Sequence, residues 1–133
     1  MKKISILALA LFIGLAAHSQ YSLSFCTFVN SANQECVFDN TKFITTPDST
    51  RAKIYMMMRS TQLFGTTKFT FKLFAIDRLG AEVAINTIVQ DVQSDWMNAW
   101  QPAIFTTPGK YLVKVYKDDG SLITSKGFEL FNY

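Results

Sequence analysis

Apolar and polar residues alternate along much of this chain with the two-residue period of a β-strand. In residues 67–76 (TKFTFKLFAI), Phe69, Phe71 and Leu73 fall on one face and polar residues fall on the other. Residues 51–60 (RAKIYMMMRS) alternate in the same way, and this pattern is typical of strands with one buried face. Five more segments are rich in β-branched or aromatic residues, which predicts strands at 21–29, 35–45, 81–90, 110–116 and 121–130.

Turn-forming residues separate these segments. Residues 77–80 (DRLG) and 117–120 (KDDG) each combine aspartate with a glycine that can adopt positive φ, which predicts short antiparallel hairpins. A longer polar connection covers residues 30–34, and residues 107–109 (TPG) mark another break. The chain therefore predicts about seven short strands joined by turns.

One segment fits two structures. Residues 80–96 (GAEVAINTIVQDVQSDW) have apolar side chains at helical as well as at strand spacing. Their run of β-branched residues favours a strand, although a helix over 81–93 stays open. Directly afterwards, Ser94 or Asp95 is a candidate N-cap, and we expect a short helical turn near residues 95–100.

Taken together, these elements predict an all-β fold, namely a single immunoglobulin-like antiparallel β-sandwich. Residues 71–83 (FKLFAIDRLGAEV) resemble the strand, turn and strand of bacterial immunoglobulin-like modules. Residues 108–130 (PGKYLVKVYKDDGSLITSKGFEL) are similar to the closing hairpin of those modules. The resemblance covers roughly the second half of the chain; it implies a fold and supplies no catalytic residues.

The first 19 residues have the pattern of a secretory signal peptide. Lys2 and Lys3 precede an apolar run, and Ala17-His18-Ser19 offers small residues before a cleavage point at Gln20. The run is shorter than a membrane span, so we expect an exported domain at residues 20–133 with no membrane span. Its location would be the periplasm, the cell surface or the medium.

Composition narrows the chemistry further. Two of the 13 basic residues, Lys2 and Lys3, leave with the signal, so the mature chain is nearly neutral and predicts no nucleic-acid binding. His18 leaves as well, which removes the imidazole that histidine triads and common zinc sites need. No glycine-rich phosphate loop occurs. We therefore expect no cofactor and no metal.

The two cysteines, Cys26 and Cys36, predict a structural disulfide, because an exported chain with an even cysteine count favours pairing. A hairpin centred near Ser31 would place them directly opposite each other. Two buried thiols are the alternative.

Carboxylates offer two further candidate sites. Asp91 and Asp95 lie near the tryptophans, as a glycosidase pair would require, but a solvated residue and a helix cap explain them better. Asp118 and Asp119 lack the spacing of a calcium loop and read as turn residues.

Three places are candidate contacts for a ligand or partner. The strand pattern points Met56 and Met58 inward, and it turns Tyr55 and Met57 outward as part of a contact patch.

Trp96 and Trp100 would share one side of a helical turn. There they would either stack on sugars or, as we favour, close one end of the sandwich where the chain crosses between sheets.

Residues 127–133 (GFELFNY) are the expected edge strand, and Phe131 and Tyr133 are its candidate partner anchors. Coverage of these rings by another part of the same domain is the alternative.

The resulting functional hypothesis is a non-enzymatic, exported binding or envelope-assembly module that acts through protein–protein contacts. Its expected partner is another envelope or surface protein. The alternative is a carbohydrate-binding domain that uses Trp96 and Trp100 on a glycan, and a carboxylate-dependent hydrolase comes third.

Overall fold

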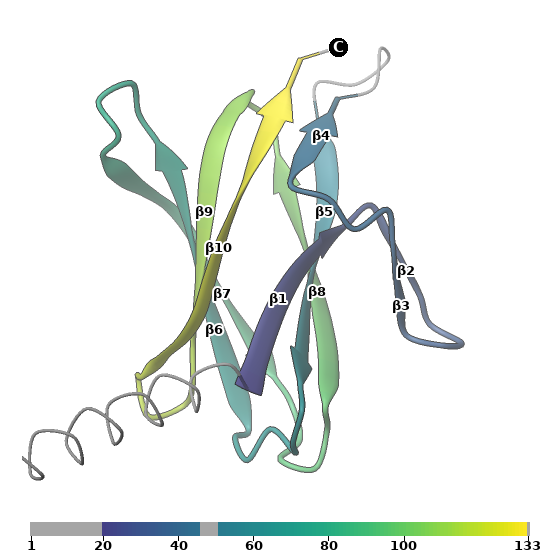
Figure 1. Cartoon of the computed structure of the whole chain (residues 1–133). Helices are drawn as coiled ribbons and strands as arrows, with labels where there is room; N and C mark the ends of the chain where they lie inside the picture. The colour runs from purple at the N-terminus through teal and green to yellow at the C-terminus, as the bar shows by residue number, and fades with distance from the viewer. Residues whose placement is uncertain (1–19, 46–50, 133) are drawn as a thin grey trace, which may run out of the picture.

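The computed structural model of this chain describes residues 20–45 and 51–132, and over these ranges it contains ten β-strands and no α-helix (Figure 1). The predicted signal peptide, residues 1–19, and the candidate anchor Tyr133 lie outside the described residues. No helix within the described ranges is long and apolar enough to cross a bilayer.

Two sheets form the layers of a β-sandwich. The three-stranded sheet has the order β1-β5-β8 and is antiparallel throughout. The five-stranded sheet has the order β4-β10-β9-β6-β7 and is antiparallel except for the parallel pair β4–β10. The strands of the first sheet are β1 (Tyr21–Cys26), β5 (Ala52–Ser60) and β8 (Asn98–Phe105), and those of the second are β4 (Lys42–Ile44), β6 (Lys68–Ile76), β7 (Glu82–Asp91), β9 (Gly109–Tyr116) and β10 (Leu122–Phe131).

A separate hairpin lies outside both layers. It consists of β2 (Phe28–Asn30) and β3 (Glu35–Val37), which pair only with each other. In Figure 1 this hairpin stands on the far side of the three-stranded sheet from the five-stranded one.

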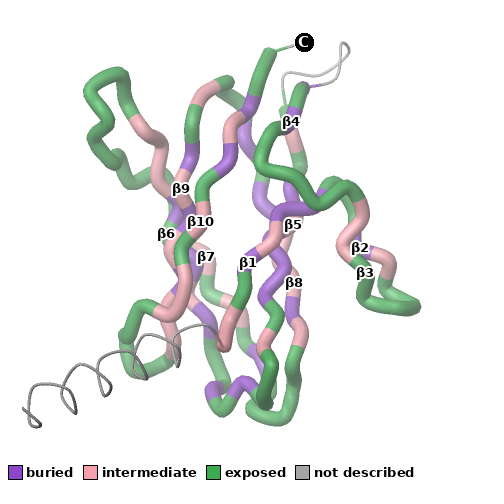
Figure 2. The backbone as a smooth tube through the Cα atoms, in the orientation of Figure 1, coloured by how far each residue is buried: buried purple, intermediate pink, exposed green. Residues whose placement is uncertain are grey.

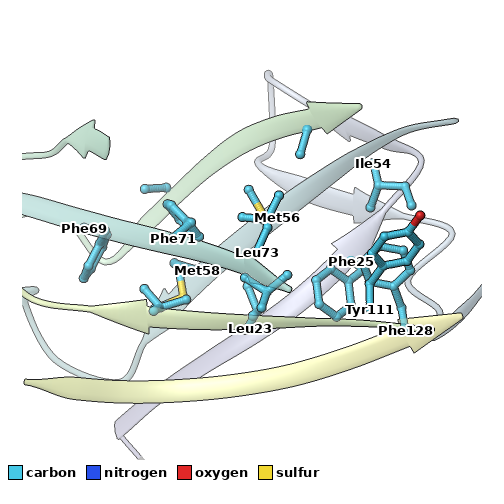
Figure 3. Packing of buried hydrophobic residues seen from close by; sticks show 14 of the residues in the cluster. Leu23, Phe25, Ile54, Met56, Met58, Phe69, Phe71, Leu73, Tyr111 and Phe128 are labelled. Carbon is cyan, nitrogen blue, oxygen red and sulfur yellow. The ribbon is translucent and has the colours of Figure 1, made fainter. Parts of the chain in front are cut away.

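The main core fills the space between the two sheets. The inward residues of β5 and β6, including Met56, Met58, Phe69 and Phe71, are fully buried, as the alternation predicted (Figure 3). The buried stretches of the backbone accordingly lie on the facing strands (Figure 2). Each large apolar side chain buried in this way contributes roughly 1.5–3 kcal/mol to folding.

Aromatic rings close one end of this core. The Phe128 ring lies 4.8 Å from Phe25 and 4.9 Å from Phe105, measured between centroids. Tyr111 stacks on Phe128 at 5.3 Å, and its hydroxyl donates a hydrogen bond to the carbonyl oxygen of Thr107. That bond fastens the start of β9 to the connection that crosses from the other sheet, in the manner of a tyrosine corner.

Both predicted hairpin turns are confirmed. Gly80 and Gly120 adopt φ of 83° and 84° at the ends of the β6–β7 and β9–β10 turns, which explains why glycine stands there. Residues 81–93, which fitted either a helix or a strand, contain strand β7. The preference for a strand, based on the β-branched residues, is therefore confirmed.

The strand count was too low. The predicted strand 21–29 divides at Thr27, where the chain bends between β1 and β2, and the predicted strand 35–45 divides into β3 and β4. Strand β8 was missed, because its first residues were assigned to the helical turn near 95–100 and the residues after it were assigned to no element.

The helical turn itself is wrong. Ser94 and Asp95 form a turn in which the amide of Trp96 donates to the carbonyl of Gln93, at 3.1 Å. From Asn98 the chain pairs with β5, so the sheet hydrogen bonds override the helical spacing of the two tryptophans.

The expected edge strand is also wrong. The end of β10 lies between β9 and β4, because Glu129, Leu130 and Phe131 pair in parallel with residues 42–44. The edges of the five-stranded sheet are β4 and β7 instead.

Cys26 and Cys36 form a disulfide, with a Cα–Cα distance of 5.4 Å. They are not a cross-strand pair, however: Cys36 lies opposite Val29 in the hairpin, and Cys26 lies opposite Tyr55 in the sheet. The difference arises because the chain turns directly after Cys26. The bridge therefore ties the hairpin to the end of β1 rather than closing a single continuous hairpin.

A second, smaller core lies beneath this hairpin. Cys26, Val29 and Met57 are buried there, and Cys36, Tyr55 and Trp100 pack against them. Met57 does point away from the main core, as expected, but it is fully buried rather than part of an exposed patch, because the hairpin covers it.

The bridge should contribute measurably to stability. Reduction, or replacement of both cysteines by serine, is expected to lower the free energy of unfolding by about 2–3 kcal/mol, because it releases a short closed loop. Urea denaturation with and without a reducing agent measures the loss. Two reactive thiols in the unfolded but unreduced protein would contradict the bridge.

Tyr111 should make stability sensitive to high pH. Burial raises the pKa of its hydroxyl above the ordinary value of 10.0. The stability that the neutral Tyr111 side chain contributes is therefore complete below about pH 10. It is lost as the pH rises through the folded-state pKa, because the phenol must then either ionise within the core or leave it. Between pH 8 and pH 11 the urea midpoint should fall further for the wild type than for Tyr111→Phe. Equal falls in the two proteins would contradict this role.

Candidate functional site

The connection from β7 to β8 carries the chain from the five-stranded to the three-stranded sheet. Its backbone is fastened to the connection between β5 and β6: Phe64 N donates to Trp96 O at 2.8 Å, and Gly65 N donates to Ser94 O at 3.0 Å. Val92 is buried at its start. The predicted crossing between sheets therefore falls at this segment, and two crossing connections hold each other in place.

The two tryptophans near this connection lie in different environments. Trp96 lies in the connection and exposes 42% of its surface. Trp100 lies in β8 and points away from the main core, opposite Met57 of β5, where it is partly covered by the second core. Neither indole is a plug between the sheets, since the first is exposed and the second packs on the outer face.

Both tryptophans nevertheless line one hollow. Its volume is about 380 Å³, and it lies between the tip of the β2–β3 hairpin and the start of β8. The lining residues are Gln34, Gln90, Trp96, Met97, Asn98, Ala99 and Trp100. None of the described residues that line it carries a charged side chain, so the hollow offers aromatic faces and carboxamides.

Gln90 contributes hydrogen-bonding capacity at the edge between β7 and β8. Its Nε2 atom donates to the carbonyl oxygen of Trp100 at 3.0 Å and thereby bridges the two sheets. Its Oε1 atom is the one buried side-chain oxygen or nitrogen in the described part of the chain that lacks a hydrogen-bond partner. A buried acceptor in this state costs about 1–3 kcal/mol.

Gln34 forms the opposite wall. It is the last residue before β3, and its backbone adopts φ of 56°, in the left-handed region. Its carbonyl oxygen accepts a hydrogen bond of 3.0 Å from Nη2 of Arg59 on β5. The hairpin tip is thus fixed to the sheet on which Trp100 lies.

The remaining predicted contact residues lie elsewhere. Tyr55 is partly buried beside the second core, with Lys53 Nζ 5.3 Å from its ring centre. Phe131 is 39% exposed and lies opposite Ile44, which is 64% exposed. These two form a small apolar pair on the outer face of the five-stranded sheet.

The four aspartates considered in the sequence analysis do not line the hollow. Neither Asp91 nor Asp95 is among the residues that line the hollow. Within residues 20–45 and 51–132, no group of three or more histidine, cysteine or acidic side chains could hold a metal ion. Asp119 instead accepts from the amide and hydroxyl of Ser121, which lowers the pKa of its carboxyl and confirms a turn role.

The three carboxamides of the hollow were missed from the sequence. Gln34, Gln90 and Asn98 come from three separate parts of the chain, and no spacing connects them. The sequence signal that did indicate this place was the pair of tryptophans. They were expected to share one side of a helical turn, whereas Trp100 lies in a strand.

Comparisons with known proteins define the fold. An immunoglobulin-like protein from Pseudomonas aeruginosa aligns with a TM-score of 0.54 at 17% identity, over 82% of this chain and 91% of the other. The PmoD soluble domain from Methylocystis sp. ATCC 49242 (Rockwell) aligns with a TM-score of 0.50 at 10% identity, over 83% and 90%. The chain is therefore an immunoglobulin-like β-sandwich, as the sequence predicted. No protein-family model matches it, and neither does any curated protein.

Proposed function

We propose that this protein is a non-enzymatic, exported binding module that holds a neutral saccharide in the hollow lined by Trp96 and Trp100. The observation that carries the proposal is the composition of the hollow. Two tryptophans, two glutamines and an asparagine line it, and none of its lining residues carries a charged side chain.

Each part of the hollow suits a sugar. The partly exposed indole of Trp96 presents a flat apolar face, on which the C–H face of a sugar ring can stack. A carboxamide both donates and accepts, so Asn98 can bond to hydroxyls in either sense. The volume of about 380 Å³ lies within the range of small-ligand sites, roughly 300–1,000 Å³.

Binding without turnover follows from the same lining. Hydrolysis of a glycosidic bond requires two carboxyl groups across the sugar, and the hollow presents none. Export is supported by the Cys26–Cys36 disulfide, because such bridges persist in oxidising compartments. The site and the bridge together favour a receptor for glycans outside the cytoplasm over a hydrolase.

Replacing Trp96 by alanine should weaken glycan binding at least tenfold, because loss of a stacked aromatic costs about 1.4 kcal/mol or more. Its exposure means that the melting temperature should change little. An array of neutral glycans, probed with wild type and variant, measures the effect. Leu79→Ala, an exposed apolar substitution in the β6–β7 turn, is the control and should bind normally. Undiminished binding by the Trp96 variant would contradict the proposal.

A second candidate function uses the pair formed by Ile44 and Phe131. Their exposure on neighbouring strands favours contact with another envelope or surface protein, for which they would be apolar anchors. This is the protein–protein role that the sequence suggested. The contact would be made by a sheet face, however, and not by the free edge of a strand.

Replacing Ile44 and Phe131 together by serine distinguishes the two candidates. If they are anchors, envelope association is lost while the melting temperature stays nearly unchanged and glycan binding is retained. Co-sedimentation of the purified protein with envelope fractions provides the measurement. A large loss of stability with association intact would show that the pair only completes the fold.

A further inference from the structure

Gln34 has a backbone conformation that its side chain disfavours. Its φ of 56° lies in the left-handed region, where a residue with a Cβ atom is strained by roughly 1–2 kcal/mol relative to the ordinary helical region. Hairpin turns that require this conformation usually place glycine or asparagine there. Glutamine at this position therefore carries a conformational cost that glycine would avoid.

Several interactions hold Gln34 in place despite that cost. Nη2 of Arg59 donates to its carbonyl oxygen, and the adjacent amide of Glu35 bonds to Oδ1 of Asn33 at 3.1 Å. Two residues further along, Cys36 is bonded to Cys26 at the end of β1. The strained residue is thus fixed from the sheet, from its own turn and through the disulfide.

The position of Gln34 explains what this arrangement achieves. It is the residue through which the hairpin lines the hollow, whereas the other lining residues come from β7, β8 and the connection between them. A glycine would relieve the strain but remove the side chain of the hairpin residue that lines the hollow.

We propose that Gln34 is a ligand-contacting, specificity-determining residue, whose strained backbone is maintained so that its carboxamide faces a saccharide bound at Trp96 and Trp100. This role rests on the proposed saccharide function. Arg59 is the positioning residue, since it acts on the ligand only through the Gln34 carbonyl. The hairpin then supplies one wall of the site, and the two indoles supply its platform.

Phe38 provides a matched control within the same chain. It follows β3, adopts nearly the same φ of 57°, is 76% exposed and is not among the residues that line the hollow. Replacing either residue by glycine relieves the same backbone strain, but only one of the two substitutions removes a group from the hollow.

The experiment compares wild type, Gln34→Gly, Gln34→Asn and Phe38→Gly, with cellohexaose and chitohexaose as probes. Trp96 and Trp100 are the two tryptophans of the chain, so intrinsic fluorescence reports directly on the hollow. Urea denaturation of the same four proteins measures stability.

Gln34→Gly should raise the Kd at least tenfold while its urea midpoint stays equal to that of the wild type or rises. Gln34→Asn keeps a carboxamide in a residue that tolerates this conformation, so it should recover part of the affinity. Phe38→Gly should match the wild type in Kd, with a midpoint that is equal or higher.

Two results would overturn the role of Gln34 alone. In one, the wild type binds a probe and Gln34→Gly binds it equally well. In the other, Gln34→Gly loses stability together with affinity, which marks a structural residue. If the wild type binds neither probe and no neutral glycan on the array, the proposed function fails, and the role of Gln34 fails with it.

Discussion

The packing of the β2–β3 hairpin against Met57 is the contact on which the hollow depends. The outer face of a sandwich sheet is normally polar, because only its inner face meets the other sheet. Here the outer face of the three-stranded sheet carries Met57 and Trp100, and the hairpin covers them. A two-stranded hairpin is marginal by itself, so its position relies on the disulfide and on this small apolar contact. The molecule thus has a large core that determines the fold and a small one that shapes the site.

The hollow exists because three independent constraints converge at one end of the three-stranded sheet. The crossing connections place Trp96, the β5–β8 register places Trp100 and Asn98, and the hairpin places Gln34. Gln90 joins them where β7 approaches β8, through its bond to the Trp100 carbonyl. Strain at Gln34 and an unsatisfied oxygen at Gln90 both occur around this hollow, although Phe38 has nearly the same backbone conformation and does not line it.

Much of the fold could be predicted from the sequence, because it follows from local rules. Phe69 and Phe71 alternate with lysine and threonine, and Gly80 and Gly120 punctuate the hairpins, so strands and turns there need no tertiary information. Strand β8 could not be predicted in this way. It contains Pro102, and its Trp100 lies at helical spacing from Trp96 in the preceding connection, so only pairing with β5 makes it a strand. Likewise, Met57 was correctly turned outward, but a strand pattern cannot show that a distant hairpin covers that face.

The site was less predictable than the fold for a related reason. Trp96 and Trp100 are close in sequence and conspicuous, whereas the carboxamides that give the hollow its polarity lie on separate elements and are ordinary surface residues in isolation. The immunoglobulin-like framework constrains its inward residues tightly but leaves connections and outer faces free to vary. A hollow built from a crossing connection, an outer sheet face and an added hairpin uses those free positions. The residues that line it can therefore change without disturbing the aromatic core around Phe128, which is why the fold alone does not identify a function.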